Sequence, residues 1–204
     1  MSKPKLYGIC DSRALRSIWM MEELGIDYEH IPVNFMEESK APEYLEVNPN
    51  GRIPALVDGD VVMCESMAIN LYLAKKYGKD LYPTDPATEA KAWQWSVWAI
   101  SEIEPLQMQI VVQKVFIPEE KRNQKVIDRA SKGLIRPFKV LNDVLAKHDF
   151  LLGAQFTVAD LNLSSVMLLI ESMQFDFTDF PNIQAWMKRC YDRPSLAKAQ
   201  AKNK

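Results

Sequence analysis

The N-terminal part of the chain alternates short apolar runs with longer segments of helical periodicity. A short strand is predicted over residues 5–9, and a helix follows because apolar residues recur at three- and four-residue spacing up to Gly25. Residues 31–35 alternate between apolar and polar side chains, which predicts a second strand. Pro42 suits the first turn of a short helix that runs to about residue 47.

The next segment has the pattern of a β-hairpin. Two short apolar runs, 55–57 and 61–64, lie on either side of Asp58-Gly59-Asp60, and Asp-Gly between such runs is a strong hairpin signal. Ser66 is a good N-cap for an apolar helix that runs to about Tyr77. The order is therefore β-α-β-α-β-β-α, with a parallel first pair and an antiparallel hairpin. This is the four-stranded mixed sheet of a thioredoxin-like α/β domain.

No convincing strand pattern appears after residue 88, so the second half is predicted to be all-α. Helices are expected over residues 89–116, 119–146 and 157–173, with two more opening at Pro181 and Pro194. Pro105 and Pro137 are expected to kink their helices. Thr157-Val158-Ala159-Asp160 has the spacing of a capping box, so Asp160 is assigned to helix initiation and not to catalysis.

The change of pattern sets the expected domain boundaries. Residues 79–88 contain Pro83 and Pro86 and few apolar side chains, as in a linker. We therefore predict a first domain over 1–78, a linker over 79–88 and a helical domain over 89–204.

Composition excludes several classes of function. A net charge of −2 over 204 residues gives no electrostatic case for nucleic-acid binding. No run approaches the roughly 20 apolar residues of a membrane span, and no apolar signal segment follows the N-terminal residues. The three cysteines lack metal or disulfide spacing and the two histidines are far apart, so no metal site is expected. Cysteine usage indicates a reducing compartment, and we expect a cytoplasmic protein with no membrane partner.

Two motifs carry a resemblance to a known family. The segment N-P-N-G-R-I-P-A-L-V-D-G from Asn48, followed by Glu65-Ser66, resembles the glutathione-binding segment of the cytosolic glutathione transferases. The run K-L-Y-G-I-C-D-S, from Lys5 to Ser12, resembles the serine-type branch, found in plant phi and theta-like and related bacterial enzymes. The resemblance covers nearly the whole chain. It implies glutathione as co-substrate, a homodimer, and a helical domain that supplies the hydrophobic substrate site.

Three residues near the first strand compete for the role of activating a thiol. A free thiol has a pKa near ~8.5 and reacts as the thiolate, so a hydroxyl donor at a helix N-terminus favours reaction. Ser12 lies four residues after Gly8, which is the spacing of the serine-type branch. Cys10 is the alternative, because some branches use a cysteine here, but their Cys-Pro pattern is absent. Tyr7 matches the tyrosine of other branches less well, because it lies within the strand.

The resemblance also implies which residues bind glutathione. Ile53, before a Pro54 that is cis in the family, would offer its backbone N–H and C=O to the cysteinyl amide. Glu65 would bind the ammonium of the γ-glutamyl end, and the hydroxyl and N–H of Ser66 its carboxylate. For Ser66 the alternative role is a plain helix cap.

Two basic residues are further candidates for binding glutathione. Arg52 occupies a position where related enzymes often have glutamine or lysine, and a guanidinium there would pair with a carboxylate. Lys40 matches a family position that contacts the glycyl carboxylate, although a lone lysine in a polar loop is often only solvated.

The leading hypothesis is a transferase that conjugates glutathione thiolate to a small hydrophobic electrophile. A second enzymatic hypothesis is a glutathione-dependent isomerase, dehalogenase or peroxidase of the same fold. A non-catalytic adaptor or a carrier of apolar ligands is the third. The presence of Ser12, Ile53-Pro54 and Glu65-Ser66 argues against an adaptor, which has no need of ligand chemistry.

Overall fold

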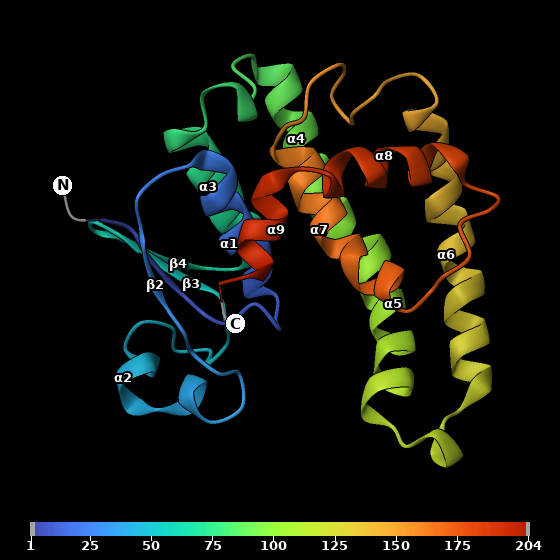
Figure 1. Ribbon diagram of the computed structural model, residues 1–204, viewed down its shortest axis with the longest axis horizontal. Coiled ribbons are helices and arrows are strands. Elements are labelled where there is room, and N and C mark those ends of the chain that lie inside the picture. Colours follow the sequence, from blue (N-terminus) through green and yellow to red (C-terminus); the bar gives the residue numbers. More distant parts are fainter. Residues whose placement is uncertain (1–2, 203–204) are drawn as a thin grey trace. The chain divides into compact units, whose positions relative to one another are not determined.

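The computed structural model describes residues 3–202 and divides into two compact units. The first unit comprises the chain up to Tyr82 together with the segment from Asp192 onward, and the second unit comprises Pro83–Tyr191. Figure 1 shows a small sheet with helices in the first unit and helices alone in the second. Among the described residues, no helix is both long enough and apolar enough to cross a membrane.

The first unit has the predicted thioredoxin-like sheet. Its elements in chain order are β1 (Lys5–Tyr7), α1 (Ala14–Leu24), β2 (Glu29–Ile31), α2 (Pro42–Leu45), β3 (Ala55–Asp58), β4 (Val61–Cys64) and α3 (Ser66–Tyr77). The strands are arranged in the order β2-β1-β3-β4. Strands β1 and β2 are parallel, whereas β3 is antiparallel to both β1 and β4. The fold predicted from the order of elements is therefore confirmed.

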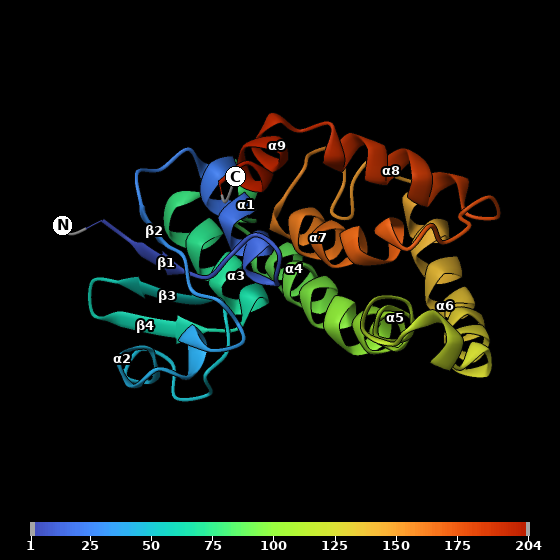
Figure 2. The ribbon, with the colours of Figure 1, turned by 60° about the horizontal axis from the view of Figure 1, so that its bottom comes forward.

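Alternation of side chains along the strands divides the core of this unit into two layers. Leu6 and Leu56 are fully buried and pair with each other across β1 and β3. Their neighbour Tyr7 points the opposite way and packs in a cluster with Tyr44 of α2. Helices α1 and α3 lie together on one face of the sheet and α2 on the other, as Figure 2 shows.

The two N-terminal strands are shorter than predicted. Strand β1 ends at Tyr7 because Gly8 adopts a φ of +135°, which turns the chain out of the sheet. The second strand was predicted over 31–35 but ends at Ile31, where the following Pro32 has no N–H to donate. Asn34 then begins a turn, in which its side chain accepts a hydrogen bond from the Met36 N–H.

One carboxylate anchors the hairpin to α3. Asp58 is 4% exposed, and it accepts hydrogen bonds from the hydroxyls of Tyr72 and Tyr77 and from the ammonium of Lys76 at 2.8 Å. Burial opposes ionisation, but the bonds from Lys76, Tyr77 and Tyr72 outweigh it and lower the pKa of Asp58. This carboxylate therefore stabilises the fold above the unfolded pKa, and its contribution is lost as pH falls through the lower folded pKa.

We expect the Asp58→Asn variant to lose about 1–3 kcal/mol of stability at neutral pH, because three donors lose a charged acceptor. The difference in the free energy of unfolding between this variant and the unaltered chain should become smaller below about pH 4, where the carboxyl group of the unfolded chain becomes protonated. Urea unfolding at neutral and acidic pH measures both effects, with Asp60→Asn in the exposed turn of the same hairpin as the control. An equal difference at both pH values would contradict the ionic role of Asp58.

The second unit is helical, as predicted. Its helices are α4 (Pro86–Trp98), α5 (Glu104–Val111), α6 (Gln124–Leu145), α7 (Val158–Ser172) and α8 (Pro181–Tyr191). Before Pro105 the chain widens into a π-helical segment, Ala99–Ile103, which accommodates the proline that cannot donate to the preceding turn. Pro137 lies inside α6, which continues to Leu145.

The last helix belongs to the first unit, which corrects the predicted extent of the helical domain. Helix α9 (Pro194–Gln200) packs on α1, and the indole of Trp19 donates to the hydroxyl of Ser195 at 2.9 Å. Arg193 forms an ion pair with Glu23 of α1. The sequence placed this segment in the domain over 89–204 because helical periodicity identifies a helix but not the surface against which it packs.

Candidate functional site

Gly8 brings three segments of the first unit together. A Cβ atom at this position would lie 2.4 Å from the Cβ of Ala14 and 3.3 Å from the Cβ of Ile53. With the positive φ of Gly8, this close approach requires glycine. The end of β1, the start of α1 and the loop before β3 therefore meet at one point.

Ser12 lies in the loop between β1 and α1 and is partly buried. Its hydroxyl donates to the Ile9 carbonyl at 2.7 Å and accepts from the Ala14 N–H at 3.0 Å. The second bond joins the loop to Ala14, the first residue of α1, whose N-cap position is occupied by Arg13 without a side-chain cap bond. Rotation about one bond is enough to redirect the hydroxyl proton, while the oxygen continues to accept from Ala14.

Cys10 is buried beside α9. Its side chain is 8% exposed, and its thiol donates to the carbonyl of Ala199 in α9 at 3.0 Å. A buried thiol that donates its proton to a carbonyl lacks the solvent exposure of reactive cysteines. Tyr7, the other competitor of Ser12, packs its ring 6.0 Å from that of Tyr44 in an apolar cluster.

The loop from Asn48 to Pro54 is organised around one carbonyl. The hydroxyl of Tyr44 and the side-chain amide of Asn48 both donate to the Arg52 carbonyl at 2.6 Å. The peptide bond between Ile53 and Pro54 is cis, as the resemblance implied. Ile53 belongs to the cluster that contains Tyr44, and within residues 3–202 no partner is found for its backbone N–H or C=O.

The two basic candidates lie at this loop. Lys40 donates from its ammonium group to the carbonyl of Gly51. Arg52 follows directly, and its side chain is exposed. Lys40 therefore contacts the loop, and the exposed side chain of Arg52 can turn towards an anionic group.

Glu65 and Ser66 lie next to the cis peptide bond because β4 pairs with β3. Ala55 is opposite Cys64, so the residues that precede Ala55 continue towards Glu65 and Ser66. Glu65 is exposed and adopts a φ of +71°, a conformation that costs about 1 kcal/mol or more in a non-glycine residue and that often marks a functional site. Ser66 is 5% exposed and is the first residue of α3, and its hydroxyl accepts from the guanidinium of Arg16 at 3.4 Å. The N-cap of α3 is Glu65, which makes no side-chain cap bond, so the prediction that Ser66 is the N-cap is wrong.

Three residues of this site were not identified from the sequence. Arg16 is 5% exposed, Asn48 is 2% exposed and Tyr44 is 5% exposed, and each contacts one of the predicted positions. Arg16 interrupts the buried face of α1, and a charged residue at a core-facing helical position is the signal that points to it. For Tyr44 and Asn48 the sequence offers no comparable signal.

Together these residues form a polar surface suited to a small peptide-like ligand. It has two helix N-termini, the hydroxyls of Ser12 and Ser66, the exposed carboxylate of Glu65, the cations of Lys40 and Arg52, and the backbone N–H and C=O of Ile53, which are unpaired in the described part of the chain. Helix N-termini and cations favour carboxylates, a carboxylate favours an ammonium group, and an unpaired backbone N–H and C=O can pair with an amide. Within residues 3–202, no group of three or more His, Cys, Asp or Glu side chains could hold a metal ion.

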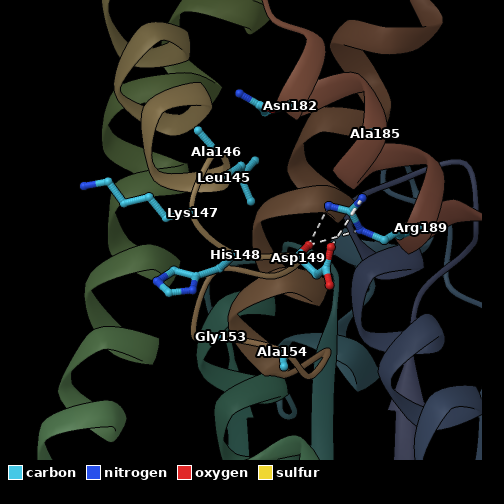
Figure 3. Close-up of a pocket in the computed structure, with 10 residues that line it drawn as sticks. All are labelled: Leu145, Ala146, Lys147, His148, Asp149, Gly153, Ala154, Asn182, Ala185 and Arg189. Carbon is cyan, nitrogen blue, oxygen red and sulfur yellow. Dashed lines mark hydrogen bonds and ion pairs between the residues drawn. The ribbon is translucent and has the colours of Figure 1, made fainter.

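A separate hollow lies in the second unit. Figure 3 shows it at the end of α6 and beside α8, with the side chains of His148 and Lys147 at its edge. Its accessible volume is about 420 Å³. The guanidinium of Arg189 contacts Asp149 there. This hollow contains none of the residues of the surface described above.

Comparison with known proteins identifies relatives over almost the full chain. Residues 2–75 match the family model "Glutathione S-transferase, N-terminal domain", and residues 103–194 match the corresponding C-terminal domain. Glutathione S-transferase 1 of Zea mays is 34% identical, over 98% of this chain and 97% of that protein. Glutathione S-transferase GstB of Escherichia coli K12 is 32% identical, over 95% of both chains. The theta class glutathione S-transferase of Xanthomonas axonopodis pv. citri, solved with glutathione bound, superposes with a TM-score of 0.89, at 30% identity and 98% coverage of both chains.

Proposed function

Because the chain belongs to the glutathione S-transferase family, we propose that it activates glutathione as the thiolate and conjugates it to a small hydrophobic electrophile. One observation carries the proposal, namely that the close approach of Gly8 to Ala14 and Ile53 brings the Ser12 loop against the segment before β3. The glutathione bound to the structural relative supports the choice of ligand.

In this proposal Ser12 stabilises the sulfur anion. Its hydroxyl turns from the Ile9 carbonyl to the thiolate, and the Ala14 N–H continues to bond to the hydroxyl oxygen and so polarises it. The N-terminus of α1 adds a partial positive charge on the same side. Both effects lower the pKa of the bound thiol, so more of it is ionised at neutral pH.

The other residues orient glutathione. The backbone of Ile53 pairs with the cysteinyl amide as an added strand would. Glu65 binds the ammonium group, and Ser66 with the start of α3 binds the α-carboxylate beside it. Lys40 and Arg52 bind the glycyl carboxylate at the other end of the ligand.

The test is a calorimetric titration with glutathione followed by an assay with a generic aryl halide in the same buffer. Binding with turnover is the expected result. Binding without turnover would favour the isomerase, dehalogenase or peroxidase alternatives over general conjugation. Absence of binding at millimolar glutathione would contradict the proposal and favour the adaptor.

We expect Glu65→Gln to weaken glutathione binding about tenfold or more, because an ammonium loses its charged acceptor while the side chain keeps its size. Titration calorimetry measures the dissociation constant. Glu43→Gln on the exposed surface of α2 is the control and should bind normally. Equal affinity for the Glu65 variant and the unaltered chain would remove Glu65 from the site.

A further inference from the structure

Two side chains converge on a single backbone oxygen next to the proposed ligand segment. The Tyr44 hydroxyl reaches the Arg52 carbonyl from α2, and the Asn48 amide reaches it from the loop itself, both at 2.6 Å. Neither donor belongs to the residues proposed to touch glutathione. Two short hydrogen bonds from different elements fix the position of this oxygen more firmly than one would.

Fixing this oxygen also fixes the N–H of Ile53. The Arg52 carbonyl and the Ile53 N–H belong to one planar peptide unit, which is trans, so they point in opposite directions. The carbonyl is turned towards Tyr44 and Asn48, and the N–H is therefore turned away from them. Within residues 3–202 it finds no acceptor.

The side chains around this peptide hold the two donors in place. Tyr44 and Ile53 are both buried in the cluster with Val33 and Ala55. The side-chain oxygen of Asn48 accepts from the Asn50 N–H at 3.2 Å, which directs its amide nitrogen towards Arg52. Burial raises the pKa of Tyr44 to about 12, so its hydroxyl keeps the proton that it donates.

We propose that Tyr44 and Asn48 are positioning residues that hold the Arg52–Ile53 peptide with its N–H directed at the ligand. The inference rests on the proposed function, because that N–H is the group offered to the cysteinyl amide of glutathione. Without these donors the peptide can rotate, and binding then has to restore its orientation at a cost in affinity. The effect falls on glutathione binding, whereas stabilisation of the thiolate depends on the separate loop of Ser12.

The test compares the variants Tyr44→Phe and Asn48→Asp with the unaltered chain. Tyr44→Phe keeps the ring in its cluster and removes one donor, and it should raise the glutathione dissociation constant and KM about three- to tenfold. The value of kcat at saturating glutathione should change less than about twofold. Tyr28→Phe, which removes a hydrogen bond of 2.8 Å to Glu22 elsewhere in the same unit, is the matched control and should bind normally.

Asn48→Asp provides a second measurement, the pH dependence of glutathione affinity, which would not change if Asn48 had only a structural role. At neutral pH its carboxylate faces the Arg52 carbonyl without a proton to donate, and glutathione binding should weaken more than tenfold. A protonated carboxyl group is again a donor, so the affinity relative to the unaltered chain should recover as pH falls through the pKa of the new side chain. Thermal unfolding of each variant identifies any loss of the folded state.

The outcomes separate this inference from the function on which it rests. Normal glutathione binding by folded Tyr44→Phe and Asn48→Asp would overturn the inference and leave the proposed function standing. Weak binding by Asn48→Asp with no recovery at low pH would also overturn it, because the donated proton would then be irrelevant. If the unaltered chain binds no glutathione, both proposals are overturned together.

Discussion

Replacement of Ser12 by alanine is expected to lower kcat/KM for conjugation about 100-fold or more while glutathione still binds. The variant removes the one hydroxyl donor proposed to stabilise the thiolate, and loss of such a donor typically costs a factor of this size. The proposed contacts of glutathione with Ile53, Glu65 and Ser66 remain, so the dissociation constant should change little. Steady-state kinetics and calorimetry measure the two quantities, and the ultraviolet absorbance of bound thiolate reports the shift in its pKa.

The control for this result is Cys10→Ala. Its thiol is buried and bonded to the carbonyl of Ala199, so its removal should leave the conjugation rate nearly unchanged. Ser12 also accepts from the Ala14 N–H, and loss of that hydrogen bond costs about 1 kcal/mol, which thermal unfolding separates from the kinetic effect. An unchanged rate in Ser12→Ala with loss of activity in Cys10→Ala would reverse the assignment of the two residues.

The parts of the fold that were predicted correctly depend on neighbours in the sequence. The hairpin follows from Asp58-Gly59 between apolar runs, and α3 begins at Ser66 and ends at Tyr77 as predicted. The positions of Ile53, Glu65 and Ser66 in one region then follow from the pairing of β3 with β4. Turn residues, helix caps and strand alternation each involve only a few neighbouring residues, so they can be identified from a single sequence.

The features that were not predicted depend on contacts between distant segments. The thiol of Cys10 donates a hydrogen bond to a carbonyl 189 residues later in the chain, and no residue near Cys10 in the sequence indicates this bond. Likewise, Arg16 meets Ser66 only because α1 packs beside α3. Tyr44 appears in the sequence as an ordinary aromatic residue of a short helix. Its hydrogen bond to the Arg52 carbonyl depends on the path by which the intervening loop brings Arg52 back to the helix. The local sequence pattern indicates the element in which such a residue lies, but it does not determine the distant residue with which it forms a hydrogen bond.

Asp160 shows how a local motif extends into a long-range network. The predicted capping box is present at the start of α7, where the Asp160 carboxylate accepts from the N–H and the hydroxyl of Thr157. The same fully buried carboxylate also accepts from the Leu151 N–H at 2.8 Å and from the indole of Trp186 at 2.9 Å. It thus joins the start of α7 to the preceding loop and to α8.

We expect Asp160→Ala to destabilise the protein by about 3–5 kcal/mol, because it leaves several buried donors without an acceptor and removes the helix cap. Asp176→Ala is a matched control, since Asp176 also accepts from the N–H and hydroxyl of a threonine, Thr178, but in an exposed turn, and its loss should cost little. Urea unfolding followed by tryptophan fluorescence measures both variants. Equal, small losses would mean that Asp160 acts only as a local cap. A loss several times larger at Asp160 would indicate that the second unit depends on this carboxylate for the packing of α7 against its neighbours.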